Sequence, residues 1–257
     1  MNLEFLIPAS AGDAIARTPM EEQIRKAGVR FERRDGWELG VEHPAGVAAA
    51  RKAVGWTDVS HLPKLELQGE SEALDALAGQ PLPFATAVRS GGAWWCRLTQ
   101  TRALVIGARP AATRDDVAVV DVTSTYAALT LVGPLARETF ARFCALDLRP
   151  EVTPVGALRP GSVGRQPAVL IREGDERYTY LFGWATSEYM WETVADAGHH
   201  LGGQPLGIDQ LAEFPIEADQ PQPDRAERPQ SNKTDRRRSH QADEPQSHTT
   251  DEEPADA

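Results

Sequence analysis

The sequence predicts an α+β fold with mostly antiparallel sheets. Short segments of alternating apolar and polar residues recur along the chain, separated by turn-forming residues, which is typical of half-buried strands. Helix-like segments occur among them, without the regular strand–helix–strand spacing of a doubly wound parallel sheet. With 257 residues, 41% of them hydrophobic, the chain is long and apolar enough to bury a sizeable core.

The first expected elements are a helix and a hairpin. Thr18-Pro19-Met20-Glu21 matches a capping box with proline at the first helical position, so a helix should run to about Ala27 and stop at Gly28. Residues 29–34 and 37–41 then alternate apolar and polar side chains, and the Asp-Gly pair between them predicts a turn that joins two strands.

Between residues 44 and 106 the sequence predicts two helices and three strands. A glycine ends the first helical segment, and a short alternating strand precedes the second. Two apolar segments separated by a polar turn then indicate a hairpin. The expected helices cover 44–54 and 70–78, and the strands cover 64–67, 94–98 and 102–106.

The second half of the folded region repeats this mixture. A helix is expected over 134–145, because Leu135, Phe140, Phe143 and Cys144 lie on or near one face of it. A last helix ends before a pair of glycines. The other expected elements are strands 117–122, 128–132, 168–171 and 178–182 and the helix 186–199.

A sharp change of composition near Phe214 divides the chain. Residues 215–257 contain six prolines, no aromatic residue, and eleven acids against six bases. Such a segment cannot bury enough apolar surface to offset its ordering entropy. We therefore expect a folded region over 1–214 and a disordered acidic tail over 215–257.

The folded region contains an internal repeat. Asp58-Val59-Ser60, a gap, and then Leu-x-Leu-x-Gly before a helix recur 63 to 64 residues later, beginning with Asp121-Val122-Thr123. The repeat predicts two small duplicated modules, about 15–116 and 117–214, that pack on each other. In each copy the aspartate is expected to cap a turn, and the glycine to allow the turn into the helix.

Charge and composition exclude several classes of protein. A net charge of −11 and a pI of about 5.1 argue against a nucleic-acid binder that works by neutralising phosphates. No segment approaches the ~18 apolar residues of a membrane span, and no signal peptide is readable, so we expect a cytoplasmic protein without membrane contact. Cys96 and Cys144 fit no disulfide framework or metal site.

The most site-like segment contains Asp58, Ser60 and His61 within four residues. A nucleophilic triad is a poor interpretation, because triad members are brought together by the fold from distant positions. Asp58 and Ser60 can instead cap a turn. His61 can either bind a ligand or satisfy the backbone.

Other candidates are weaker. His199-His200 would cap a helix C-terminus, and Asp115-Asp116 would be solvated in a loop. In a strand, Tyr178, Tyr180 and Phe182 share one face, which would either stack on a flat heterocycle or form a core wall.

Three segments together resemble the glycine cleavage T-protein superfamily. The Asp-Val-Ser-His block with its flanks is fairly specific, and the other two are supportive. The segments are 35–62 (with Gly36-Trp37-Glu38 and Asp58-Val59-Ser60-His61-Leu62), Val132-Gly133-Pro134-Leu135-Ala136-Arg137, and Tyr189-Met190-Trp191-Glu192 with Pro205-Leu206-Gly207-Ile208-Asp209. The Tyr-Met-Trp-Glu helix and the Leu-Asp-Leu-x-Pro after Cys144 are most similar to the gamma subunit of heterotetrameric sarcosine oxidase.

This resemblance implies a T-protein-like fold that binds tetrahydrofolate. It places the folate-binding residues on two loops: Asp58, Ser60, His61 and Leu62 on one, and Tyr178 on the other. A basic residue near the mouth is expected for the folate carboxylates, with Arg89, Arg97 and Arg172 as candidates. The implied partner is a flavoprotein amine-oxidase subunit or another one-carbon enzyme.

The sequence also departs from the family pattern. The family's catalytic acid would fall between Phe84 and Arg109, but no acid occurs between Asp75 and Asp115. The family's Gly-Tyr-Thr-Gly-Glu turn is shortened at 172–178, where Asp175 or Glu176 would have to substitute. The family's C-terminal barrel is expected to be missing.

Three hypotheses stay open at this point. The first is a folate-binding subunit or accessory protein without the aminomethyltransferase acid, whose catalytic residues are unknown. The second is an active tetrahydrofolate-dependent aminomethyltransferase that uses an unrecognised acid such as Asp115 or Asp58. The third is a scaffold without folate.

Overall fold

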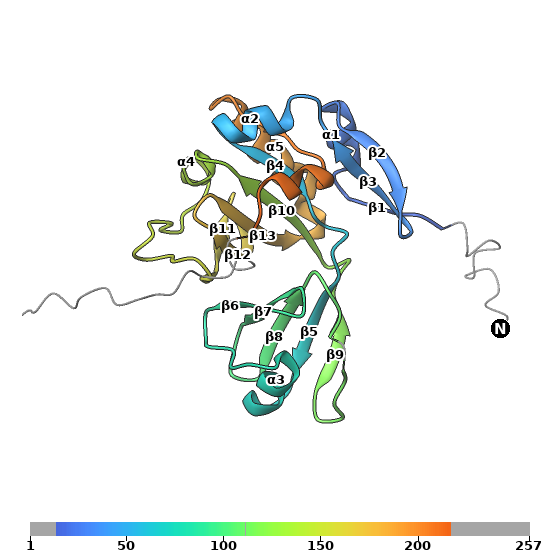
Figure 1. Ribbon diagram of the computed structural model, residues 1–257, viewed down its shortest axis with the longest axis vertical. Helices are drawn as coiled ribbons and strands as arrows, with labels where there is room; N and C mark the ends of the chain where they lie inside the picture. The colour runs from blue at the N-terminus through green and yellow to red at the C-terminus, as the bar shows by residue number, and fades with distance from the viewer. Residues whose placement is uncertain (1–13, 111, 217–257) are drawn as a thin grey trace, which may run out of the picture. The chain divides into compact units, whose positions relative to one another are not determined.

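Three sheets organise residues 14–110 and 112–216, which the computed structural model describes (Figure 1). All but two of their strand pairings are antiparallel, which confirms the predicted α+β class. None of the three sheets in these residues closes into a barrel.

The first sheet has the order β1-β3-β2 and the second the order β11-β12-β13-β10-β4-β14. The strands of the first are β1 (Ala16–Arg17), β2 (Arg30–Arg34) and β3 (Trp37–Glu42). Those of the second are β4 (Gly55–Asp58), β10 (Tyr126–Val132), β11 (Leu158–Val163), β12 (Gln166–Gly174), β13 (Arg177–Gly183) and β14 (Gln204–Pro205).

The third sheet has the order β6-β7-β8-β5-β9. Its strands are β5 (Lys64–Gln68), β6 (Ala87–Ser90), β7 (Ala93–Arg97), β8 (Arg102–Ile106) and β9 (Ala118–Asp121). The helices are α1 (Glu21–Lys26), α2 (Gly46–Lys52), α3 (Ser71–Ala78), α4 (Ala136–Ala141) and α5 (Ser187–His199), with 3-10 turns η3 (Trp184–Thr186) and η4 (Ile208–Glu213). None of these helices is long and apolar enough to cross a membrane.

The two copies of the internal repeat exchange strands between the second and third sheets. β4, which ends at Asp58 of the first copy, pairs with β10, which carries the Leu-x-Leu segment of the second copy. Conversely, β9, which ends at Asp121 of the second copy, pairs with β5, which carries the Leu-x-Leu segment of the first copy. The chain therefore passes between the same two sheets twice, once in each copy of the repeat.

Each crossing is made by the same turn. Ser60 N donates to Asp58 Oδ1 (2.9 Å), and Thr123 N donates to Asp121 Oδ1 (3.0 Å). The next backbone bond is also shared in type, from Leu62 N to Val59 O and from Thr125 N to Val122 O. The prediction that both aspartates cap turns is confirmed.

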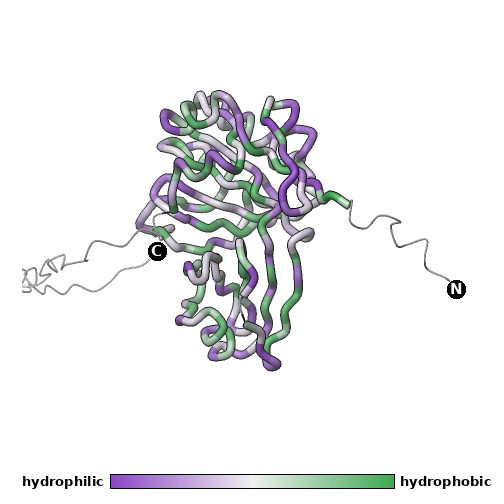
Figure 2. The backbone as a smooth tube through the Cα atoms, turned by 45° about the vertical axis from the view of Figure 1, so that its right-hand side comes forward, coloured by the Kyte–Doolittle hydropathy of each residue, from purple (hydrophilic) through white to green (hydrophobic). Residues whose placement is uncertain are grey.

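Three apolar cores lie between the sheets and the helices that pack on them. One lies between the second sheet and the helices α1, α4 and α5, and Trp56, Phe140 and Tyr180 are fully buried in it. Another lies between the second and third sheets, and the last joins α3 to the far face of the third sheet. In Figure 2 hydrophobic and hydrophilic segments alternate along the backbone of the folded part.

Several predicted elements differ in extent. α1 begins at Glu21 with no side-chain cap, because Thr18 Oγ1 accepts from the nearer Met20 N (3.3 Å) in a turn; the predicted capping box is wrong. α4 ends at Ala141 instead of Ala145, since Cys144 pairs with Val163 in an isolated bridge.

Most of the predicted tail, 217–257, lies outside the described residues. Its first two residues are described, and Ile216 packs against the core between the second and third sheets. The ordered core thus reaches past the composition break at Phe214.

Gly133, which ends β10 in the second copy, is required by both its conformation and its surroundings. Its φ is +114°, and a Cβ there would lie 2.3 Å from Ala50 O and 2.7 Å from Ala53 O. Both neighbours are backbone carbonyls, which cannot rotate away.

We expect Gly133→Ala to destabilise the fold by about 4 kcal/mol or more, because strain and a backbone clash combine. Gly79→Ala is the matched control: its φ is +72°, but nothing lies within 4 Å of the new methyl, so it should cost only about 1 kcal/mol. Urea unfolding measures both, and equal losses would contradict this assignment.

Candidate functional site

A cavity of about 240 Å³ lies where the second and third sheets face each other. Its wall is made by both sheets, by the loop after β4, and by the segment from η4 onward. The lining residues are Val59, Leu62, Arg89, Gly92, Trp94, Ile106, Gly107, Thr130, Glu173, Arg177, Thr179, Ile208, Leu211 and Ile216. Small-molecule pockets usually measure about 300–1,000 Å³, so this cavity suits a ring system or part of a larger ligand.

A buried ion pair marks one side of the cavity. Arg177 Nε donates to Glu173 Oε2 at 2.7 Å, and both side chains are largely buried. Arg177 Nη1 also donates to the carbonyl of Phe214, which ties the C-terminal segment to the cavity wall. Glu173 therefore brings a buried carboxylate, paired with Arg177, to the cavity wall.

Trp94 supplies an aromatic wall with an unused donor. The side chain is buried, and its Nε1 has no hydrogen-bond partner among the described residues. The Arg89 guanidinium carbon lies 5.1 Å from the Trp94 ring centroid, and Arg89 Nη1 donates to Gly92 O. An unpaired buried N–H is costly, so a ligand acceptor would satisfy it.

Two threonines complete the polar lining. Thr130 on β10 and Thr179 on β13 are cross-strand partners, and their hydroxyl oxygens are 2.6 Å apart. Each is buried. One hydroxyl must donate to the other, so only one of the two protons is available to a ligand.

The structure places the predicted loop residues beside the cavity but only Leu62 on its wall. Asp58 caps the turn, and Ser60 Oγ is buried and accepts from Ala128 N at 3.0 Å. His61 packs edge-on to Trp37, with 6.5 Å between ring centroids, and burial lowers its pKa. Their role in binding folate remains a prediction.

Tyr178 lies on the other side of the second sheet. It is fully buried against Phe140, with ring centroids 5.6 Å apart. Because side chains alternate along a strand, Arg177 and Thr179 face the cavity while Tyr178 faces the helices. The structure therefore does not bring Tyr178 together with the Asp58–Leu62 loop.

Of the arginines considered for the mouth, only Arg89 lines the cavity. Arg97 is buried in bonds to Asp75, Ser71 and main-chain carbonyls. Arg172 is buried against the carbonyls of Thr153 and Gly174 and the carboxylate of Asp175. Both guanidinium groups are therefore engaged in bonds within the protein.

The acids named from the sequence also lie outside the cavity lining. Asp175 and Glu176 are exposed at the hairpin tip, and Asp115 is exposed in the loop before β9. Glu173, which sequence reasoning passed over, is the only acid on the cavity wall in the described residues. Its signal was a pair of charged residues, Arg172-Glu173, directly after the apolar segment 168–171.

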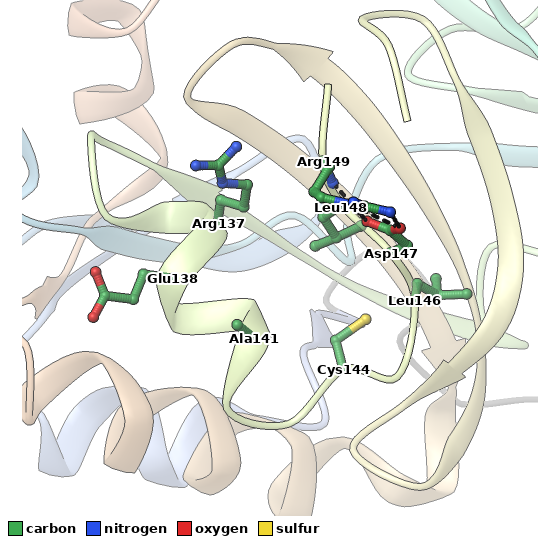
Figure 3. Close-up of a pocket in the computed structure, with 8 residues that line it drawn as sticks. All are labelled: Arg137, Glu138, Ala141, Cys144, Leu146, Asp147, Leu148 and Arg149. Carbon is green, nitrogen blue, oxygen red and sulfur yellow. Dashed lines mark hydrogen bonds and ion pairs between the residues drawn. The ribbon is translucent and has the colours of Figure 1, made fainter. Parts of the chain in front are cut away.

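A second hollow, about 500 Å³, lies between α4 and the segment 144–149 (Figure 3). Arg149 is already paired with Asp147, and most of the lining is exposed. Cys144 is free, but burial raises the pKa of its thiol. This hollow offers a ligand no buried polar group comparable to Glu173 or Trp94.

The family model for the GCVT N-terminal domain matches residues 95–221. The fold agrees with solved structures of the same group. In sequence and in fold the chain is similar to the glycine cleavage T-protein-like family.

Two solved structures share the T-protein-like fold. A chain of the heterotetrameric sarcosine oxidase from Corynebacterium sp. U-96 matches with a TM-score of 0.57 and 21% identity, covering 73% of this chain and 97% of that one. The glycine cleavage system aminomethyltransferase T from Bartonella henselae matches with a TM-score of 0.62 and 17% identity, covering 76% and 60%.

Sequence relatives are aminomethyltransferases. That of Desulfitobacterium hafniense is 24% identical over 240 residues, which is 80% of this chain and 65% of the relative. That of Mycobacterium bovis is 26% identical over 221 residues, 74% of this chain and 59% of the relative. This T-protein-like chain therefore spans less than two thirds of the length of these relatives.

The residues that the structure describes contain no group of three or more His, Cys, Asp or Glu side chains placed to hold a metal ion. The polar groups of the cavity are one ion pair, one indole N–H, one further arginine and two hydroxyls. They suit an organic ligand with several hydrogen-bonding atoms.

We expect Arg177→Met to destabilise the T-protein-like domain by about 3–5 kcal/mol, because it leaves Glu173 buried and unpaired. Arg149→Met is the control, since its pair with Asp147 is exposed and should be worth less than about 1 kcal/mol. Chemical unfolding measures both; a small loss for Arg177→Met would show that the Glu173 pair is solvated.

Proposed function

We propose that this chain binds a reduced folate in the cavity and acts as a T-protein-like subunit or accessory protein of amine and one-carbon metabolism. The observation that carries the proposal is the buried Glu173 carboxylate beside the unpaired Trp94 indole N–H. A bound reduced folate would supply the carrier of one-carbon units.

The cavity lining fits the pterin end of such a ligand. The pyrimidinone edge of a pterin presents adjacent N–H donors, which a carboxylate accepts well. Trp94 offers a flat apolar face and a donor for a ring nitrogen or carbonyl. A cavity of about 240 Å³ holds the ring system, and the glutamate end would extend toward solvent, where Arg89 can meet a carboxylate.

The same lining argues against aminomethyl transfer by this chain alone. Cleaving a cationic amine adduct calls for a carboxylate that orients and stabilises it. Glu173 is the only acid among the lining residues described, and Arg177 already neutralises it. We infer that the residues here bind and orient a ligand, and that bond chemistry requires another protein.

A flavoprotein amine oxidase is the proposed partner. The support is the match of the fold to 97% of one chain of a heterotetrameric sarcosine oxidase. An imine formed by amine oxidation yields a one-carbon unit on hydrolysis, and a neighbouring folate would capture that unit. Co-purification with a flavin-containing subunit from native cells tests this assignment.

We expect 5-formyltetrahydrofolate to bind the purified chain, measured by titration calorimetry. Trp94→Phe should weaken binding about three- to tenfold, because it removes one hydrogen-bond donor worth roughly 0.5–1.5 kcal/mol. Trp95→Phe is the matched control: Trp95 packs in the core beneath α3, and its Nε1 donates to Ser90 O. It should leave affinity unchanged.

Absence of binding by the wild-type chain would refute the folate proposal. Equal effects of the two tryptophan changes would place the ligand elsewhere. Production of methylenetetrahydrofolate by the purified chain alone from an aminomethyl donor would instead establish the active aminomethyltransferase.

A further inference from the structure

Lys64 is a fully buried lysine at the point where the chain crosses from the second sheet to the third. Its Nζ donates to Ser60 O at 2.8 Å and to Leu62 O at 3.0 Å. Its backbone joins the other crossing, because Lys64 N donates to Thr123 Oγ1 and Val122 N donates to Lys64 O. Lys64 thus contacts the first copy of the repeat through its side chain and the second copy through its backbone.

The two carbonyls that Lys64 holds belong to the loop that forms part of the cavity wall. Val59 and Leu62 line the cavity, and Ser60 lies between them. Ser60 Oγ accepts from Ala128 N, and Val59 N donates to Ala128 O, so the start of the loop is fixed to β10. Within the part of the chain that the structure describes, Leu62 itself is held by the bond from Leu62 N to Val59 O and by the Lys64 ammonium.

We propose that Lys64 is a positioning residue for the ligand site: its two hydrogen bonds hold the 59–62 loop in the shape that presents Val59 and Leu62 to the bound molecule. This inference rests on the proposed function, since it names a residue that holds part of the wall of the same cavity in place. Lys64 does not itself line the cavity, so it acts through the loop.

The charge of Lys64 is sensitive to pH within an accessible range. Burial is the main cause that lowers the pKa of Lys64 to about 8, while Asp58 and Asp121 oppose this shift. His61 also faces the ammonium, but burial lowers its own pKa below 6.5, so it is neutral in this range. Raising the pH through about 8 therefore removes the charge from Lys64 and weakens both bonds, because hydrogen bonds from a charged donor are stronger.

The affinity of the wild-type chain for 5-formyltetrahydrofolate should fall about three- to tenfold between about pH 7 and about pH 9.5. Lys64→Met should bind more weakly at pH 7 and show none of this extra pH dependence. Lys52→Met is the matched control, because Lys52 is exposed at the end of α2; it should keep the wild-type profile. The difference between profiles cancels any titration of the ligand.

A second measurement needs no variant and no ligand. The chain has four lysines, so selective ¹³C labelling of their ε carbons gives a small set of signals to follow by NMR. One signal should titrate near pH 8, and the methyl signals of Val59 and Leu62 should shift with the same midpoint.

The outcomes separate the two proposals. Identical pH profiles for wild type and Lys64→Met would overturn the role of Lys64 while leaving folate binding intact. If the wild-type chain binds no folate, the folate proposal fails, and the NMR titration alone decides: Val59 and Leu62 signals that do not respond to Lys64 would overturn this inference as well.

Discussion

The strand exchange between the two copies of the repeat is the constraint on which the rest of the structure depends. β4 pairs with β10 and β5 pairs with β9, so neither sheet is complete without strands from both copies. The two crossings lie side by side, tied together by Lys64 and Thr123. Because the sheets are joined there, they face each other at a fixed separation, and the cavity forms between them.

The polar groups of the cavity are consistent with this construction. Sheets that meet face to face normally bury apolar side chains, as the core between these two does. Thr130, Glu173, Arg177 and Thr179 interrupt that core from one sheet, and Arg89 and Trp94 approach from the other. A buried ion pair stabilises a fold weakly at best, so its presence in this core agrees with selection for binding.

Much of the fold was predictable from local pattern. Alternation identified most strands, and the repeat, read as Asp-Val-(Ser/Thr) before Leu-x-Leu-x-Gly, identified both crossing turns correctly. Strands β6 and β11 were among those missed, because Val88-Arg89-Ser90 and Pro160-Gly161-Ser162 carry little alternating apolar signal. Their pairing is decided by neighbouring strands, which a local pattern does not contain.

The candidate site was harder to predict than the fold. The aromatic residues Tyr178, Tyr180 and Phe182 drew attention to one face of β13, while the cavity lies on the other. A shift of one residue along a strand exchanges its two faces, and only the position of the second sheet decides which face meets a ligand. Glu173 likewise becomes conspicuous only when its burial is known.

Arg177 donates to the Phe214 carbonyl and so holds the C-terminal segment against the cavity wall, which matters for the preparation of fragments. Composition suggests cutting the chain at Phe214, where the acidic segment begins. Ile216, however, is part of the cavity wall. A fragment trimmed at the compositional boundary would lack Ile216 from the cavity wall, so a failure of that fragment to bind a ligand would not speak for the full chain.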